Sequence, residues 1–228
     1  MQTLVMIPGL GSDGEIWKRT IAALGSRANC SVGDTQNDQS LSGMAQRILD
    51  HAPERFALAG VSMGGMVALE MMKLAPQRVT RLALVDTNAR SDPMAKKVYR
   101  HLANLVVATT SDFERLSRSS VGALVHPSAS EDVRVELATM GARVGARIYR
   151  RQNRAVAMRK DLRSVLPGIG VPTAVVVGSD DHVTPFECSR EIHDLIPGST
   201  LHVISDCGHL PPIEKPEALA AILLDLLD

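Results

Sequence analysis

The sequence is poor in the features that mark several specialised classes of protein. Its 228 residues include three cysteines (Cys30, Cys188 and Cys207), and only 3% of them are aromatic. An odd number of cysteines without Cys-x-x-Cys spacing argues against a disulfide framework or a structural zinc site, and it indicates a reducing compartment. No run of about 18 apolar residues occurs, and the first residues, MQTLVMIPG, lack a basic segment. We therefore expect a cytoplasmic protein with neither a signal peptide nor a membrane span.

The chain also lacks net charge, because 25 Lys and Arg residues balance 25 Asp and Glu residues. Bulk electrostatic attraction to nucleic acid or to an anionic membrane therefore has no support. The balance hides an asymmetry, since residues 81–165 contain 16 basic and 8 acidic side chains and the remainder contains 9 and 17. We expect no nucleic-acid or membrane partner, but a charged small-molecule substrate is compatible with this distribution.

Short apolar runs alternate with longer segments of helical period along most of the chain. Strands are predicted at 3–7, 28–32, 56–60, 82–86, 173–178 and 201–205, and helices at 14–24, 41–52, 64–75, 186–196 and 216–227. Several strands are apolar throughout, as strands that are buried on both faces must be. The pattern predicts an α/β fold with a doubly wound, mostly parallel sheet.

The segment 88–170 breaks this alternation. It shows helical patterning near 93–108, 111–124 and 130–163 and no convincing strand. The length of the chain suits one domain with an insertion. We therefore predict a core formed by residues 1–87 and 171–228, with an all-helical insertion at 88–170.

A first glycine cluster, Gly9-x-Gly11-x-x-Gly14, follows a predicted strand and opens a helix. With Asp34 lying 20 residues beyond Gly14, it matches the fingerprint of dinucleotide binding. Acidic residues beside the would-be phosphate site argue against that interpretation. The alternative is a glycine turn that lets strand and helix pack closely.

A second cluster, Gly60-Val-Ser62-Met-Gly64, lies between the strand at 56–60 and the helix at 64–75. A strand, a tight turn and a helix form the context that a nucleophilic serine elbow requires. Glycines two residues before and after the serine remove collisions between the turn and its neighbours. The spacing alone is weak evidence, and the context strengthens it.

Two further polar clusters follow predicted strands. Asp180 and Asp181 come directly after the strand at 173–178, and His209 follows the strand at 201–205. Because the carboxyl ends of parallel strands meet at one edge of a sheet, we expect Ser62, one of these aspartates and His209 to lie close together. Taken alone, each is more typical of a solvated turn or loop. The residues after Asp181 also predict a helix start near 186, with the Thr184 side chain as its N-cap.

Four motifs together carry a resemblance to the α/β-hydrolase family over nearly the whole chain: PGLGSD at 8–13, GVSMGG at 60–65, GSDDHVTP at 178–185 and GHLPPIEKPE at 208–217. The resemblance implies that Ser62 is the nucleophile, that His209 is the general base, and that a carboxylate orients the imidazole. In the family pattern the acid lies three residues after the glycine that ends its strand, which favours Asp181 over Asp180.

The resemblance also gives the first glycine cluster a different role. It implies that the backbone N–H groups of Leu10 and Met63 form the oxyanion hole, with the glycines exposing the backbone. The chain departs from the family in having Pro8 where histidine is common. It also begins almost at the first of these strands, so we expect a minimal core without the early antiparallel strands of larger relatives.

Residue types narrow the reaction class that the resemblance implies. Family members that displace halide or open epoxides use an aspartate at the elbow, and Ser62 argues against both reactions. We expect a carboxylesterase acting on a small ester, thioester or lactone, without a cofactor or metal. The insertion corresponds to the family's cap, so its arginines, above all Arg147 and Arg151, are candidates for binding an anionic substrate. The alternative is a solvated helix face.

Three other functions are left open by the residues. A carbon–carbon bond hydrolase or cofactor-free lyase would use the same triad. An NAD(P)-binding oxidoreductase would depend on Gly9, Gly11 and Gly14. A ligand receptor that keeps the fold without the activity is the third, and the sequence gives no indication of oligomeric state.

Overall fold

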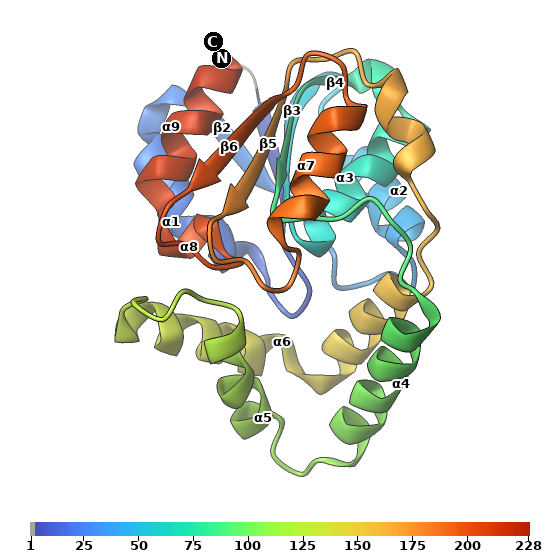
Figure 1. Ribbon diagram of the computed structural model, residues 1–228, viewed down its shortest axis with the longest axis vertical. Helices are drawn as coiled ribbons and strands as arrows, with labels where there is room; N and C mark the ends of the chain where they lie inside the picture. Colours follow the sequence, from blue (N-terminus) through green and yellow to red (C-terminus); the bar gives the residue numbers. More distant parts are fainter. Residues whose placement is uncertain (1–2) are drawn as a thin grey trace.

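The computed structural model describes residues 3–228, and its centre is one sheet of six parallel strands in the order β2-β1-β3-β4-β5-β6 (Figure 1). The strands are β1 (Thr3–Ile7), β2 (Asn29–Val32), β3 (Phe56–Val61), β4 (Val79–Val85), β5 (Thr173–Gly178) and β6 (Thr200–Ile204). The predicted doubly wound α/β fold is confirmed. β4 begins three residues earlier than the apolar run suggested. Its first residues pair with the start of β3 alone, since pairing with β5 begins at Leu82.

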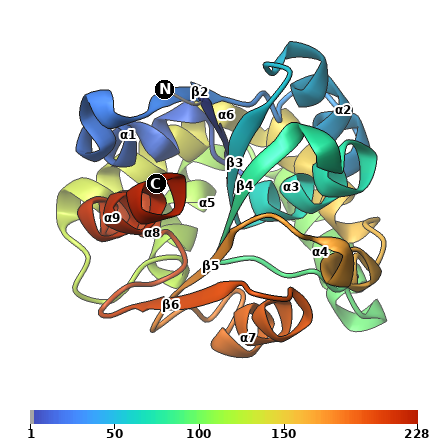
Figure 2. The same cartoon turned by 90° about the horizontal axis from the view of Figure 1, so that it is seen from above.

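Helices cover both faces of the sheet (Figure 2). One face carries α1 (Lys18–Leu24) and α9 (Pro216–Leu227), and the other carries α2 (Leu41–His51), α3 (Met63–Leu74) and α7 (Phe186–Leu195). Leu4 and Met6 of β1 belong to the hydrophobic core on the side of α1 and α9, while Val5 and Ile7 belong to the core on the side of α2, α3 and α7. Burial on two faces explains why the central strand β3 is apolar at every position.

The residues between β4 and β5 fold as helices only. This cap segment, residues 88–170, contains α4 (Met94–Thr109), α5 (Phe113–Ser120) and α6 (Glu131–Ala157), with short 3₁₀ turns at Val121–Ala123 and Arg163–Gly168. Figure 1 shows it beside the ends to which the β5 and β6 arrows point. The backbone leaves helical geometry at Gly145 (φ 76°, ψ 163°), so the long helix α6 is kinked there.

Two local differences from the predicted elements have simple causes. The expected helix at 14–24 starts as a 3₁₀ turn, Gly14–Trp17, where Asp13 caps the backbone N–H of Glu15. A short helix, α8 (Pro211–Glu214), follows the His209 loop and was not predicted. None of the helices in residues 3–228 combines the length and the apolar character that crossing a membrane requires.

Candidate active site

Ser62 lies at a strained turn between β3 and α3. Its φ of 55° and ψ of −118° are unusual for a residue with a side chain, and such strain is found mostly at functional sites. A Cβ atom at Gly60 would meet the Gly64 carbonyl, and one at Gly64 would meet the Ile7 carbonyl. The two glycines are therefore required for the tight passage from strand to helix.

His209 lies in the loop after β6, and its Nε2 atom is 2.8 Å from Ser62 Oγ. Hydrogen bonds from three backbone N–H groups hold this loop. The His209 N–H donates to the Leu124 carbonyl at 2.8 Å. The Glu214 carboxylate accepts from the N–H groups of Gly208 and Leu210, which flank the histidine. Glu214 belongs to a motif quoted for the resemblance, but its bracing role was not predicted.

Asp181 contacts the other nitrogen of the imidazole, with 2.8 Å between Asp181 Oδ2 and His209 Nδ1. The carboxylate is almost fully buried and also accepts from the N–H groups of Val183 and Thr184 and from the Thr184 hydroxyl. Burial alone would raise the pKa of Asp181, but the hydrogen bond from His209, the positive charge of His209 and hydrogen bonds with the side chains of Asp86 and Thr184 outweigh it and lower the pKa. Asp181 is therefore an anion at neutral pH.

Asp180 points elsewhere. Its carboxylate accepts from the Ser179 hydroxyl and lies 3.7 Å from His126 Nε2. The structure therefore brings Asp181, rather than Asp180, to His209. Because the carboxylate faces Nδ1, that nitrogen carries the proton and Nε2 is free to accept the Ser62 hydroxyl proton.

The expectation for Thr184 was wrong. Helix α7 begins at Phe186 with Pro185 in the N-cap position and no side-chain cap. The Thr184 hydroxyl donates instead to Asp181 Oδ2 at 2.7 Å. In a capping box the hydroxyl oxygen would accept from a backbone N–H, whereas here the hydroxyl donates to a buried carboxylate three residues earlier in a charge-assisted hydrogen bond.

The residues that follow β4 also reach the site, although their sequence pattern predicts no role for them beyond ending a strand. The Thr87 hydroxyl donates to the Ser62 carbonyl at 2.7 Å, which ties the elbow to β4. The Asp86 carboxyl is fully buried and accepts from the Gly178 N–H at 2.9 Å. Atoms of Asp86, Asp181 and His209 all lie within 4.8 Å of one another.

The Ser62 side chain opens into a cavity of about 590 Å³ between the sheet and the cap segment, and Leu10 and Met63 line it beside the serine. Met63 is the first residue of α3, where backbone N–H groups lack helical partners. The loop that carries Leu10 is fixed from the cap, since the Gly11 N–H donates to Gln152 Oε1 at 2.8 Å. Most of the cap's contribution to the cavity is apolar, including Leu102, Val106, Phe113, Leu116 and Leu137.

Arg147 and Arg151 do not lie among the residues of 3–228 that line this cavity. Tyr149 of the same helix does line it, and a residue two positions away in an α-helix points about 200° away. The cations that the cavity does contain are Lys96, Arg100 and Arg159. The cavity therefore contains three other cations in place of the two expected arginines. Which side chains reach the cavity depends on how α4 and α6 are rotated about their axes.

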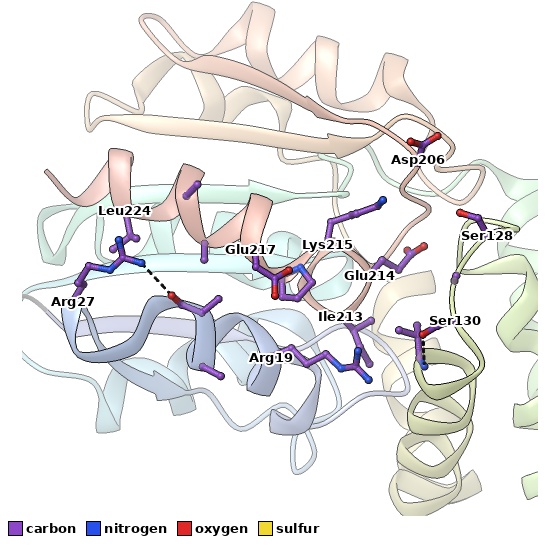
Figure 3. Close-up of a pocket in the computed structure, with 17 residues that line it drawn as sticks. Arg19, Arg27, Ser128, Ser130, Asp206, Ile213, Glu214, Lys215, Glu217 and Leu224 are labelled. Atoms are coloured by element: carbon purple, nitrogen blue, oxygen red, sulfur yellow. Dashed lines mark hydrogen bonds between the residues drawn. The ribbon is translucent and has the colours of Figure 1, made fainter.

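A second cavity, of about 900 Å³, lies between α1, α9 and the loop before α6 (Figure 3). Side chains of both signs point into it, among them Arg19, Glu217 and Lys215. Ser62, Asp181 and His209 are absent from its lining, so it is separate from the hydrogen-bonded chain described above.

Comparison with known proteins shows to which family the chain belongs. A model of the alpha/beta hydrolase family matches residues 4–222. The chain belongs to this family. The pimeloyl-[acyl-carrier protein] methyl ester esterase of Vibrio cholerae is 26% identical over 242 residues, which cover 98% of this chain and 93% of the esterase.

Solved structures show the same architecture. A thermophilic esterase from Thermogutta terrifontis, determined with malate bound, is 25% identical, with a TM-score of 0.89 over 100% of this chain and 89% of the esterase. The enol-lactonase from Burkholderia xenovorans shares the fold at 21% identity, with a TM-score of 0.85 over 99% of this chain and 91% of the lactonase.

Family membership and sheet order together argue against a dinucleotide site at Gly9, Gly11 and Gly14. Two mononucleotide-binding halves produce the strand order 3-2-1-4-5-6, in which strand 2 lies between strands 3 and 1. Here β1 lies between β2 and β3 instead. The Gly11 N–H, which would face a pyrophosphate, donates to Gln152 instead. The glycine cluster is thus a turn that links the sheet to the cap.

Proposed function

We propose that this protein is a serine hydrolase that cleaves a small carboxylic ester, thioester or lactone through an acyl-enzyme on Ser62. The observation that carries the proposal is the chain of two 2.8 Å hydrogen bonds from Ser62 Oγ through His209 to Asp181, at the wall of a cavity. The names of the V. cholerae and T. terrifontis relatives, both esterases, support this reaction class.

In the first half of the reaction His209 Nε2 takes the Ser62 hydroxyl proton as the serine oxygen attacks the carbonyl carbon. The carbonyl oxygen becomes an oxyanion, which the backbone N–H groups of Leu10 and Met63 would stabilise. The imidazolium forms beside the Asp181 anion, which stabilises its charge. His209 then donates the proton to the leaving oxygen or sulfur, and the acyl group stays on Ser62.

In the second half a water molecule replaces the leaving group. His209 removes a proton from this water, and the resulting hydroxide attacks the acyl carbon through a second oxyanion. Collapse of that intermediate returns the proton to Ser62 and releases the carboxylic acid. These steps use the side chains and backbone groups of this chain together with one water molecule.

The cavity walls suggest the substrate class. Lys96, Arg100 and Arg159 stand at a cavity that is otherwise mostly apolar, and the carboxylate of Asp92 pairs with both arginines. One carboxylate against three cations leaves positive charge at this wall. We therefore propose an ester with an apolar part and an anionic group, such as a monoester of a dicarboxylic acid.

Labelling with a fluorophosphonate probe tests the activated serine. We expect rapid labelling of the wild-type protein, loss of labelling in Ser62→Ala, and strong slowing in His209→Ala. A wild-type protein that is not labelled at neutral pH would contradict the proposal.

A panel of esters then separates the alternative functions. Monoesters of dicarboxylic acids should be better substrates than neutral esters of equal length. A labelled protein that turns over every ester only in trace amounts would favour the carbon–carbon hydrolase or lyase. A biological activity that persists in Ser62→Ala would favour the receptor.

A further inference from the structure

Asp86 combines a buried carboxyl group with an unusual backbone conformation. Its side chain is fully buried, and its backbone is in the left-handed region, with φ at 43°. A non-glycine residue with positive φ is uncommon, and the strain persists only where the surroundings impose it. The Asp86 N–H donates to the Val176 carbonyl at 2.8 Å, which fixes the end of β4 against β5.

The ionisable groups that face Asp86 are mostly acidic. Asp181 and Glu214 are carboxyl groups, His209 is a basic group, and Cys207 is a buried thiol that Lys215 also influences. Asp181 and His209 already form a hydrogen-bonded pair at 2.8 Å. A second anion close to Asp181, away from water, would be costly because like charges repel strongly there.

The hydrogen bonds of Asp86 show where a proton would be held. Oδ1 accepts from the Gly178 N–H at 2.9 Å. Within residues 3–228, Oδ2 is buried without any partner that can donate to it. A buried oxygen without a donor is explained if it carries a proton itself and faces an acceptor, and the neighbouring carboxylate is Asp181.

We propose that Asp86 is a neutral carboxylic acid that positions Asp181 by directing its Oδ2–H toward that carboxylate. The inference rests on the proposed function, in which Asp181 orients His209. Asp86 is a positioning residue in this account, since it acts on the substrate only through Asp181 and His209.

Electrostatics agree with this arrangement. Burial, followed by the negative charge of Asp181, raises the pKa of the Asp86 carboxyl well above its usual value, although the Gly178 N–H opposes the shift. Two carboxyl groups in contact that share one proton are a known solution to like-charge repulsion. The Asp86–Asp181 pair then holds a single negative charge beside His209, and Asp181 gains a donor from the sheet side in addition to its donors from the loop 183–184.

Two variants test the inference. Asp86→Asn keeps a neutral donor of the same shape, so its kcat/KM should stay within about threefold of the wild type, with the acidic limb of the pH profile unmoved. Asp86→Leu removes the donor, and its kcat/KM should fall by about tenfold or more. If Asp86 were an anion, Asp86→Asn would remove a negative charge from His209 and shift the acidic limb to lower pH, which would overturn the proposal.

An infrared difference spectrum gives a readout that does not depend on activity or on the folding of Asp86→Leu. At pH 7 the wild type minus Asp86→Asn should show the carbonyl stretch of a protonated carboxylic acid, and only carboxylate bands would contradict the inference. Failure of the proposed function looks different, because Ser62 would not be labelled by the fluorophosphonate in any of these proteins. If the wild type is labelled and Asp86→Leu reacts as fast as the wild type, the positioning role of Asp86 is refuted alone.

Discussion

The core and the cap segment hold their charged side chains by opposite kinds of hydrogen bond. In the core, carboxylates accept from backbone N–H groups: the buried Asp181 from Val183 and Thr184, and the half-buried Glu214 from Gly208 and Leu210. In the cap segment, buried guanidinium groups donate instead. Arg159 donates to the Arg90 and Val156 carbonyls and to Asp92. Acidic groups thus fix the loops at the strand ends, while basic groups fix helices above them.

The two regions also differ in how completely they bury apolar side chains. All six residues of β5 are buried, whereas α4 leaves Met94 73% exposed and Tyr99 70% exposed. Part of this exposed face continues into the cavity, since Tyr99 and Leu102 line it. We therefore expect changes in the core to affect the chemical step strongly, and changes in the cap segment to affect stability or substrate choice more weakly.

The largest effect is expected from the core acid. Asp181→Asn should lower kcat by about 10⁴-fold, because an amide favours the wrong imidazole tautomer and cannot stabilise the imidazolium. Asp180→Asn is the matched control and should change kcat little, since Asp180 does not contact His209. Steady-state kinetics with one ester decide between them, and the reverse order would show that the acid is assigned to the wrong residue.

Asp86 should produce the next effect, on stability. Its raised pKa means that the folded protein holds a proton that the unfolded chain loses above about pH 3.9. The stability due to this proton is present at low pH and is lost as pH rises toward the folded pKa. Relative to Asp86→Asn, the wild type should lose about 1.4 kcal/mol of unfolding free energy per pH unit in this window. Urea unfolding at several pH values would reveal a constant difference if Asp86 is an ordinary anion.

The kink in the cap segment offers a smaller effect. Gly145 has a φ and ψ that only glycine adopts readily, so Gly145→Ala should cost about 1–3 kcal/mol of unfolding free energy. Gly168→Ala is the control, because that glycine has open space and no positive φ, and it should be close to neutral. Thermal unfolding measures both. Equal effects would mean that the kink is not imposed by the fold.

The smallest effect should be on substrate choice. Lys96→Met removes a cation from the cavity and should raise KM for a monoester of a dicarboxylic acid by about three- to tenfold, with little change for a neutral ester. Lys97→Met, one residue along the same helix and outside the cavity lining, should change neither value. A uniform change for both esters in Lys96→Met would remove the case for an anionic substrate.

The sequence predicted the core better than the cap segment for physical reasons. Apolar runs reveal buried strands, and polar residues after them must meet at one edge of a parallel sheet, so Ser62, Asp181 and His209 could be found from spacing and family pattern. Asp86 could not, because an aspartate that ends a strand looks like a turn residue until its burial is known.

In the cap segment the predicted helices are present, but the direction of each side chain depends on helix rotation and on the kink at Gly145. A helical wheel cannot place Arg147 and Arg151 without that information. The same limit applies to Lys96 and Arg100, whose position at the cavity comes from how α4 packs on α6.

If the reaction passes through an ester on Ser62, this intermediate can be trapped. The enzyme would be mixed with an activated ester, quenched with acid within the first turnovers, digested and examined by mass spectrometry. We expect the peptide that contains Ser62 to be heavier by the mass of the acyl group, and we expect no acylated peptide at this position in Ser62→Ala. An acyl group on another residue, or turnover of the ester without any covalent species, would contradict the proposed acyl-enzyme on Ser62.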